Sequence, residues 1–372
     1  MIYLDNAATT KPCREAVAAM TRALTENWGN PSAVHGLGLR AEQAVKAARG
    51  QVAEALGCAP ERVFFTSGGT EGDNFAVSSV ARRHGKRGRH IITTAVEHHG
   101  VLNPVRALEE QGFEVTYLKP TPDGSISKKD LLAALRSDTI LVSVMMVNNE
   151  TGAVNDIAGM AKLVHQKSRA VFHTDAVQGF LKVPFRASSL GADLITVSGH
   201  KIGGPKGVGA VYMADSTHLP PLLYGGGQEK NMRSGTENVP GIVGFGAACG
   251  ACRKDWREKI RQMEALKNSC LAGLAEIPGV EVIGAHAAPH IISLAVPGVR
   301  SQGLIGALEQ REIYVSAGSA CSRGHRSHVL EAMEVPGPVI DGAIRVSLGF
   351  ETGPQDVDGF LSGLREAIRE LQ

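Results

Sequence analysis

Between about residues 40 and 250, short apolar runs alternate with helical patterns. The runs read "RVFFTS", "HIITT", "EVTYL", "TILVSVMM", "AVFHTD", "DLITVSG" and "VGAVYM". Strands that alternate with helices favour parallel pairing, with the helices covering the faces of the sheet. The pattern therefore predicts an α/β fold built on a mainly parallel sheet.

The pattern changes after residue 250. Gly250 to Glu276 is predicted as one charged, amphipathic helix that bridges two domains, and "VEVIG", "HIISLAV" and "AIRVSLG" follow as strands. The last predicted helix carries one apolar face, formed by Val357, Phe360, Leu361, Leu364, Ile368 and Leu371. A chain of 372 residues suits two domains. We expect a large domain over 15–250 and a smaller α/β domain formed by 1–14 and 251–372.

Composition excludes several classes of protein. A net charge of +2 argues against direct binding of nucleic acid, and no apolar run is long enough to cross a membrane. No basic stretch followed by an apolar one, as in a signal peptide, stands at the start. The six cysteines are scattered, which favours reduced thiols over a disulfide framework. We therefore expect a cytoplasmic protein.

Polar residues follow most of the predicted strands at the point where each strand ends. The strand ends read "SGGTEGDN", "AVEHHG", "NNETG", "HTDAVQ" and "SGHK". Ligands of open parallel sheets bind at the carboxyl ends of the strands. One shared site is the simplest interpretation of these five ends.

Each of these features also has a simpler interpretation. The glycine-rich turn at Gly69 fits a plain strand-to-helix turn as well as a phosphate cradle at a helix N-terminus. Asp175 alone would be read as a helix cap, and Lys201 alone as a solvated lysine. Together, a phosphate cradle, an acid and a lysine 26 residues later match the needs of pyridoxal 5'-phosphate (PLP). The lysine forms a Schiff base with PLP, and the carboxylate keeps the pyridine nitrogen protonated.

Ten ordered motifs also resemble one known family. They are "YLDNAATT", "NPSAVHGLG", "FTSGGTEGDN", "VEHHGV", "VNNETG", "HTDAVQ", "SGHKIGGPKGVGAVY", "GGGQEKNMRSGTEN", "SAGSACS" and "IRVSLG". In this order they resemble the NifS/IscS-type cysteine desulfurases, which belong to the class V aminotransferase group of PLP enzymes with fold type I. The resemblance extends from Tyr3 to Gly349 and implies that Lys201 carries the cofactor.

The resemblance also assigns roles to the other residues. Gly69, Thr70, Ser198 and His200 match positions that bind the PLP phosphate. Three residues match positions around the cofactor ring. His98 matches the residue that stacks on the ring and moves protons, Asp175 the partner of the pyridine nitrogen, and Gln178 the partner of the ring oxygen.

Three further positions concern the substrate and the oligomer. Asn149 matches a residue at the cofactor and substrate, and Arg345 matches the arginine that binds the substrate carboxylate. Thr236 matches a residue that reaches the phosphate of a neighbouring subunit, which implies a homodimer.

Cys321 determines the expected activity. Its surroundings, "SAGSACSRGHR", are small, polar and basic, which suits an exposed thiol with a favoured thiolate. The resemblance implies that Cys321 takes sulfur from L-cysteine, becomes a persulfide, leaves L-alanine and passes the sulfur to an acceptor protein. Sulfur would then serve iron–sulfur cluster, thio-cofactor or tRNA biosynthesis. Selenocysteine lyase or a related PLP β-lyase is the alternative.

The other cysteines are interpreted as structural. We expect Cys13, Cys58 and Cys270 to be inert core thiols. Cys249 and Cys252 have a redox-type spacing, but their alanine- and glycine-rich surroundings favour close helix packing.

The segment after Cys321 is shorter than the family pattern, with only Ser322 to Arg326 before Ser327. A shorter loop reaches less far, so transfer of sulfur to a scaffold protein would be restricted or would need a different acceptor. The same segment raises a metal-binding hypothesis, because Cys321, His325 and His328 have ligand spacing. No fourth ligand is evident, so we expect no intrinsic metal site and at most a cluster held in transit by Cys321. A metal- or cluster-binding partner protein on this scaffold is the second alternative.

Overall fold

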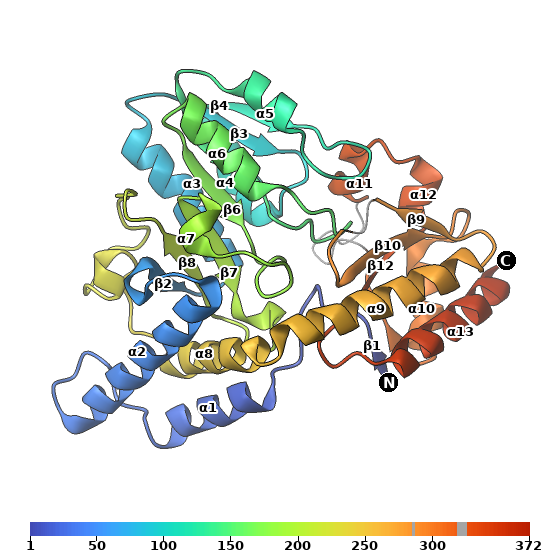
Figure 1. Ribbon diagram of the computed structural model, residues 1–372, viewed down its shortest axis with the longest axis horizontal. Helices are drawn as coiled ribbons and strands as arrows, with labels where there is room; N and C mark the ends of the chain where they lie inside the picture. Colours follow the sequence, from blue (N-terminus) through green and yellow to red (C-terminus); the bar gives the residue numbers. More distant parts are fainter. Residues whose placement is uncertain (285–286, 318–325) are drawn as a thin grey trace.

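The computed structural model describes residues 1–284, 287–317 and 326–372. Its largest element is a seven-stranded sheet, shown on the left of Figure 1. Its strands, in spatial order, are β2 (Val63–Thr66), β8 (Gly209–Met213), β7 (Leu194–Ser198), β6 (Val171–Asp175), β5 (Thr139–Ser143), β3 (His90–Thr94) and β4 (Glu114–Leu118). All seven predicted runs are confirmed as strands. Only β8 runs antiparallel to its neighbours, so the sheet is mainly parallel, as predicted.

Both faces of this sheet are covered, which explains why its strands are almost continuously apolar. Ile91, Leu141 and Leu194 face a cluster that includes residues of α3 (Gly69–His84) and α4 (His99–Glu110). The alternate residues Ile92, Val142 and Ile195 face the opposite cluster. That second cluster includes residues of α1 (Arg14–Thr25), α2 (Gly36–Leu56), α6 (Ile157–Lys167), α7 (Ala187–Leu190) and α8 (Val239–Arg253). The short helix α5 (Lys128–Ala134) adds Leu131 to the same cluster.

A second, smaller group of elements lies on the right of Figure 1. Its antiparallel sheet has the order β12 (Ala343–Ser347), β10 (Ile291–Ala295) and β9 (Glu281–Ile283). The helices α9 (Trp256–Ala275), α10 (Ser301–Glu309) and α13 (Pro354–Leu371) supply its apolar core. The short helices α11 (His328–Ala332) and α12 (Gly337–Asp341) cover a separate apolar cluster beside β9 and β10.

The first strand, β1 (Ile2–Tyr3), joins this second group. It pairs in parallel with β11 (Ile313–Tyr314), and Asp5 forms a further parallel bridge with Ser347. Figure 1 shows the N-terminus beside α13, far from α1 and α2. Residues 4–13 then run back towards the large sheet, so the segment lies along both groups of elements.

Two details differ from the predictions. The predicted helix from Gly250 to Glu276 is wrong, because α8 ends at Arg253 and α9 begins at Trp256. Asp255 separates them with a φ of 56°, a left-handed conformation that ends a helix. On α13, the predicted apolar face is buried except for Leu371, which is 41% exposed at the end of the helix.

Candidate active site

A cavity of about 310 Å³ lies at the carboxyl ends of the central strands. It is lined by ten of the residues predicted for the site, namely Gly69, Thr70, His98, Asn149, Asp175, Gln178, Ser198, His200, Lys201 and Arg345. They come from elements spread over almost the whole chain, so the fold gathers into one place what the sequence keeps apart. Thr236 is exposed and does not line this cavity.

One end of the cavity is formed by the first turn of α3. A Cβ atom on Gly69 would lie 2.8 Å from Cγ2 of Val177, so only glycine allows the turn to pack this closely. Beside it, the buried hydroxyl of Ser198 has no hydrogen-bond partner among the described residues. An unpaired buried hydroxyl next to a helix N-terminus suits a phosphate oxygen. This end therefore fits the phosphate of PLP, and a second cavity of about 470 Å³ adjoins it.

Lys201 ends the short 3₁₀ helix η2 (Gly199–Lys201), which follows β7 directly. Its Nζ donates to the carbonyl oxygens of Ala7 at 2.6 Å and Ala8 at 2.8 Å. Burial, followed by the nearby charge of Arg345, lowers the pKa of Lys201 to about 8. A lysine with a lowered pKa supplies more unprotonated amine at neutral pH, which is the form that attacks an aldehyde.

The acid is the last residue of β6. Asp175 is buried, and its Oδ1 accepts a hydrogen bond from the backbone of Val177 at 2.8 Å. Burial raises the pKa of Asp175 to about 6, which a cationic ring nitrogen would counteract. Next to it, Nε2 of Gln178 donates to the carbonyl of Ala7. The carboxylate is thus held in place by its own turn and fits a protonated pyridine nitrogen.

Two histidines of the cavity are neutral. Nδ1 of His98 accepts a hydrogen bond from the backbone of Gly100 at 3.0 Å and caps α4, so the ring proton is assigned to Nε2. Burial, with the charge of Lys201, lowers the pKa of His98 to about 4. Burial also lowers the pKa of His200 to about 4, and its Nδ1 lies 3.2 Å from Oγ1 of Thr9. A neutral imidazole can accept a proton only on its unprotonated nitrogen, so proton uptake by His98 would take place at Nδ1 and replace the hydrogen bond from Gly100.

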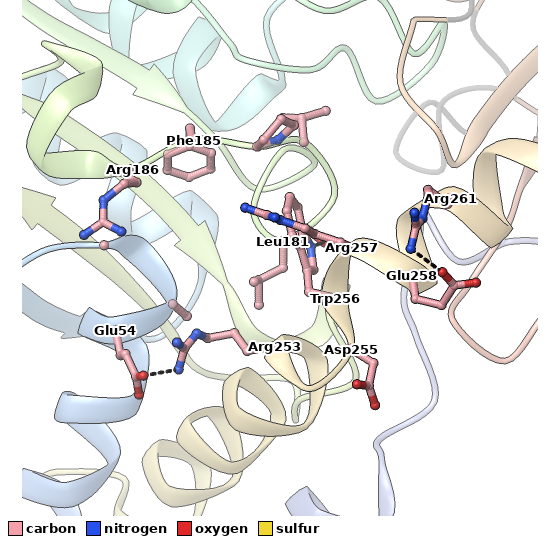
Figure 2. Close-up of a pocket in the computed structure, with 14 residues that line it drawn as sticks. Glu54, Leu181, Phe185, Arg186, Arg253, Asp255, Trp256, Arg257, Glu258 and Arg261 are labelled. Atoms are coloured by element: carbon pink, nitrogen blue, oxygen red, sulfur yellow. Dashed lines mark hydrogen bonds and ion pairs between the residues drawn. The ribbon is translucent and has the colours of Figure 1, made fainter.

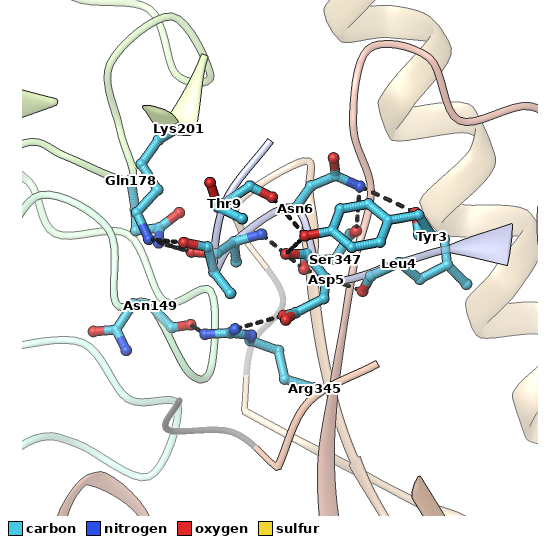
Figure 3. Close-up of polar contacts among 12 residues, drawn as sticks. Tyr3, Leu4, Asp5, Asn6, Thr9, Asn149, Gln178, Lys201, Arg345 and Ser347 are labelled. Atoms are coloured by element: carbon cyan, nitrogen blue, oxygen red, sulfur yellow. Dashed lines mark hydrogen bonds and ion pairs between the residues drawn. The ribbon is translucent and has the colours of Figure 1, made fainter. Parts of the chain in front are cut away.

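Arg345 lies on β12 and points from the smaller sheet into the cavity (Figure 3). Its Nη1 donates to the backbone oxygen of Asn149 at 2.7 Å, and its Nη2 donates to Oδ1 of Asp5 at 2.9 Å. The side chain is 2% exposed, yet Nε has no hydrogen-bond partner among the described residues. The buried guanidinium therefore keeps a free donor, which fits a substrate carboxylate.

The sequence analysis missed the part that the N-terminal segment plays. Ala7 and Ala8 line the cavity, and their carbonyl oxygens receive the amine of Lys201. Asp5 is bound to Arg345. The motif "YLDNAATT" was the available signal, but neither its charge pattern nor its periodicity shows which residues it meets in space.

Cys321 and His325 lie outside the residues that the structure describes. His328 is described, and its Nε2 is 3.0 Å from the carbonyl oxygen of Glu97, so one ring nitrogen already has a partner. Within 1–284, 287–317 and 326–372, no group of three His, Cys, Asp or Glu side chains is arranged to hold a metal. No helix formed by these residues combines the length and apolar character needed to cross a bilayer.

The five described cysteines are free thiols. Cys249, Cys252 and Cys270 are buried, as expected for packing residues. Cys13 and Cys58 are only partly buried, so they are less enclosed than core residues. Burial still raises the pKa of each of the five thiols, which disfavours the reactive thiolate.

Comparisons of sequence and fold show which known proteins this chain is similar to. The family "Aminotransferase class-V" matches residues 2–360. Cysteine desulfurase IscS of Methanosarcina thermophila is 40% identical over 376 residues, covering 100% of this chain and 93% of its own. A solved NifS-like protein superposes with a TM-score of 0.94 at 37% identity and covers 100% of both chains. The solved structure of SspA in complex with cysteine has a TM-score of 0.80 at 32% identity, over 94% of this chain and 99% of its own.

These proteins are similar to the chain over nearly its whole length, and the fold is that of the NifS-like PLP enzymes of fold type I. The predicted cofactor is therefore confirmed as PLP. The chain belongs to the class-V aminotransferase family.

Proposed function

We propose that this protein is a PLP-dependent cysteine desulfurase, which converts L-cysteine to L-alanine and takes up the sulfur on Cys321. The main observation is the cavity of about 310 Å³, in which Lys201, Asp175 and Arg345 meet. Relatives named as cysteine desulfurases support the activity. None of the relatives named here is a selenocysteine lyase or a metal-binding partner protein, so the desulfurase is preferred to both alternatives.

Each side chain has a defined task in this proposal. Lys201 supplies the amine to which the PLP aldehyde is attached, while Ser198 and the first turn of α3 bind the phosphate. Bound there, PLP withdraws electrons from the substrate carbons and weakens the C–S bond. Asp175 holds the ring nitrogen, and the neutral His98 accepts and returns protons above it.

Arg345 and Cys321 complete the assignment. The free Nε of Arg345 binds the substrate carboxylate and orients the amino acid towards Lys201. The thiolate of Cys321 attacks the substrate sulfur, so an S–S bond forms as the C–S bond breaks and L-alanine leaves. This role of Cys321 is proposed from the sequence motif and from the activity of the relatives.

The test supplies L-cysteine to the PLP-loaded protein with a thiol reductant and measures L-alanine and sulfide. We expect equal amounts of both products. Cys321→Ala should keep the visible absorbance of bound PLP but lose sulfide release, whereas Lys201→Ala should lose the absorbance of the lysine-bound cofactor. Full turnover by Cys321→Ala would instead favour a β-lyase that needs no cysteine nucleophile.

We also propose a homodimer whose Thr236 completes the cofactor site of the partner subunit. Thr236 is exposed and outside its own cavity. We define a flank by α1, α2, the loop between them and the segment that leads to Thr236. Its exposed large apolar side chains are Val17, Leu24, Trp28, Val34, Leu39, Leu223 and Tyr224. Such a group of exposed apolar residues is typical of an interface. The segment that carries Thr236 is tied to this flank, because Arg49 of α2 binds Glu229 through two hydrogen bonds of 2.7 and 2.6 Å.

Sedimentation velocity tests the dimer. Val34→Asp places a charge in the proposed interface and should give monomers that retain PLP poorly. Leu132→Asp, on exposed α5 outside this flank, is the matched control and should stay dimeric. A wild-type protein that sediments as a monomer at micromolar concentration would contradict the proposal.

The sulfur acceptor is proposed to be a protein that comes close to this active site, because the segment after Cys321 is short. Its far end is fixed: Ser327 caps α11 and donates to Glu150, and Arg326 binds Asp341 at 2.7 Å. To test this proposal, candidate acceptor proteins are mixed with the persulfide form of the protein, and mass spectrometry shows which of them gains a sulfur atom. We place the protein in the cytoplasm, since its described cysteines are free thiols. We keep 15–250 as the large domain, because the seven-stranded sheet lies within it and is separate from the two smaller sheets.

A further inference from the structure

Lys182 is a buried lysine that the mechanism above does not use. Its side chain is 3% exposed, in the turn that follows Asp175 and Gln178. The preceding residue, Leu181, has a φ of 57°, a left-handed conformation that is costly for leucine. The indole of Trp256 donates to the carbonyl of Leu181 at 2.8 Å, and Figure 2 shows these two residues together at the edge of a groove. The backbone that directs Lys182 inwards is therefore strained and held from outside.

The ammonium of Lys182 has unusual partners. Its Nζ is 3.3 Å from the backbone oxygen of Lys201 and 5.4 Å from the centre of the Phe350 ring. None of the described carboxylates forms an ion pair with it. Lysine is almost never buried without a counter-charge, because desolvation of the ammonium is unfavourable. A position that combines this feature with backbone strain points to a function.

The surroundings of Lys182 leave its charge unbalanced. The nearby thiol of Cys252 donates to the carbonyl of Ile202, and burial raises its pKa to about 12, so it is neutral. Lys259 of α9 is a second cation near the same ring, with its Nζ 5.9 Å from the centre of Phe350. His290 is neutral as well, since burial keeps its pKa well below the usual range.

The charges that face Lys201 come from several elements. Arg345 of β12 and Lys182 disfavour a proton on the Lys201 amine, while Asp175 of β6 and Asp5 favour it. The neutral rings of His98 and His200 add no charge. Burial lowers the pKa of Lys182 to about 8, so it is mostly protonated at pH 7. It therefore places a positive charge against the peptide of Lys201.

We propose that Lys182 is a positioning residue for the cofactor lysine: its buried ammonium fixes the Lys201 carbonyl and raises the share of the Lys201 amine that is unprotonated and reactive. A second cation close to an amine disfavours protonation, and this is a known way to activate a nucleophilic lysine. The hydrogen bond to the carbonyl fixes the backbone of η2 at the same time. The inference rests on Lys201 being the cofactor lysine of the proposed function.

The experiment measures the Lys201 amine directly, in the PLP-free protein. Acetic anhydride is added at a series of pH values, and mass spectrometry follows the acetylation rate of Lys201, which gives the midpoint of its titration. Lys182→Met removes both charge and donor, Lys182→Gln keeps a donor without charge, and Lys182→Arg keeps the charge. Lys167→Met, an exposed lysine on α6, is the control.

We expect the Met and Gln variants to shift the midpoint upwards by about 0.3 pH unit, which is about twofold less free amine at pH 7. The Arg variant and the control should stay close to wild type. Midpoints of the Met and Gln variants that coincide with wild type would overturn the proposal. A wild-type midpoint in the Gln variant alone would also overturn it, because the charge would then have no effect.

Two readouts keep this result separate from the proposed function. Acetylation needs neither PLP nor turnover, so an inactive enzyme could still show the shift. In the PLP-loaded protein, the pH titration of the visible absorbance should move in the same direction in the Gln variant, and Lys182→Arg should restore it. If Lys182→Met does not fold, as judged by circular dichroism, the comparison of Gln with Arg decides.

Discussion

The guanidinium of Arg345 donates to the carboxylate of Asp5 across 2.9 Å, although the two residues are 340 positions apart (Figure 3). Arg345 is buried, and Asp5 is the one described carboxylate with which it forms an ion pair. The substrate carboxylate would therefore approach an arginine whose charge is already partly neutralised. Asp5 sets how strongly Arg345 attracts the substrate.

Asp5→Asn should test this relationship, because asparagine keeps the shape and a hydrogen-bond acceptor but removes the charge. We expect the free energy of unfolding of the PLP-free protein to fall by about 1–3 kcal/mol, since a buried cation loses its partner. We also expect KM for L-cysteine to decrease severalfold. Arg345→Lys is the matched control and should raise KM, because lysine lacks the bidentate donor geometry. A raised KM in Asp5→Asn would show that Asp5 orients Arg345 more than it competes for it.

Ser198→Ala should have opposite effects on the apoprotein and on cofactor binding. The Ser198 hydroxyl is buried without a partner among the described residues, so its removal should leave the stability of the PLP-free protein unchanged or slightly higher. The same change should weaken PLP binding about tenfold, which corresponds to one lost hydrogen bond to a charged group. Thermal unfolding and equilibrium dialysis provide the two measurements. Unchanged PLP affinity would mean that Ser198 does not contact the phosphate.

Cofactor uptake by the apoprotein should depend on pH through Lys201. The pKa of Lys201 is lowered to about 8, and only the unprotonated amine attacks an aldehyde. The initial rate of PLP uptake should therefore rise about tenfold per pH unit below 8 and level off above it. Stopped-flow absorbance measures this rate. A flat profile between pH 6.5 and 8.5 would contradict the titration of a lysine in this step.

Acid sensitivity should depend on a histidine outside the cavity. His173 on β6 is fully buried, and burial lowers its pKa to about 3. Between pH 6.5 and 3 the unfolded chain binds a proton at this position and the folded chain does not, so stability is lost as pH falls. At pH 5 this amounts to about 2 kcal/mol.

His173→Gln removes this titration, although the loss of contacts to Ser143 and Thr196 should lower stability at pH 7. We expect the difference in unfolding free energy between pH 7 and pH 5 to shrink by about 2 kcal/mol in the variant. Urea denaturation of the PLP-free protein at both pH values measures it. An unchanged difference would mean that other groups with lowered pKa values, such as His98 and His200, control the response to acid.

The sequence predicted the strands of the seven-stranded and three-stranded sheets because each of these strands is a short apolar run bounded by turn residues. The convergence of Asp175, Ser198 and Lys201 followed from one rule, that parallel strands present their carboxyl ends at the same edge. The antiparallel direction of β8 was outside that rule, since a run of apolar residues carries no information about direction.

Other features depend on contacts between distant parts of the chain. The pairing of β1 with β11, which brings Asp5 to Arg345, has no local signal in either segment. The left-handed conformation of Leu181 is equally hidden, because the contact that accompanies it comes from Trp256, which is distant in the sequence. Tertiary contacts, rather than local preference, determine these positions.

The pairing of β1 with β11 has a consequence for biosynthesis. Residues 2–8 leave the ribosome before their partners on β11 and β12, which are translated more than 300 residues later. The large sheet can form during translation, whereas the carbonyl groups that receive the Lys201 amine reach their places only when the last strands have been made. The vitamin-binding pocket is therefore completed only after β11 and β12 have been made, and a nascent chain stalled before residue 313 should be unable to take up its cofactor.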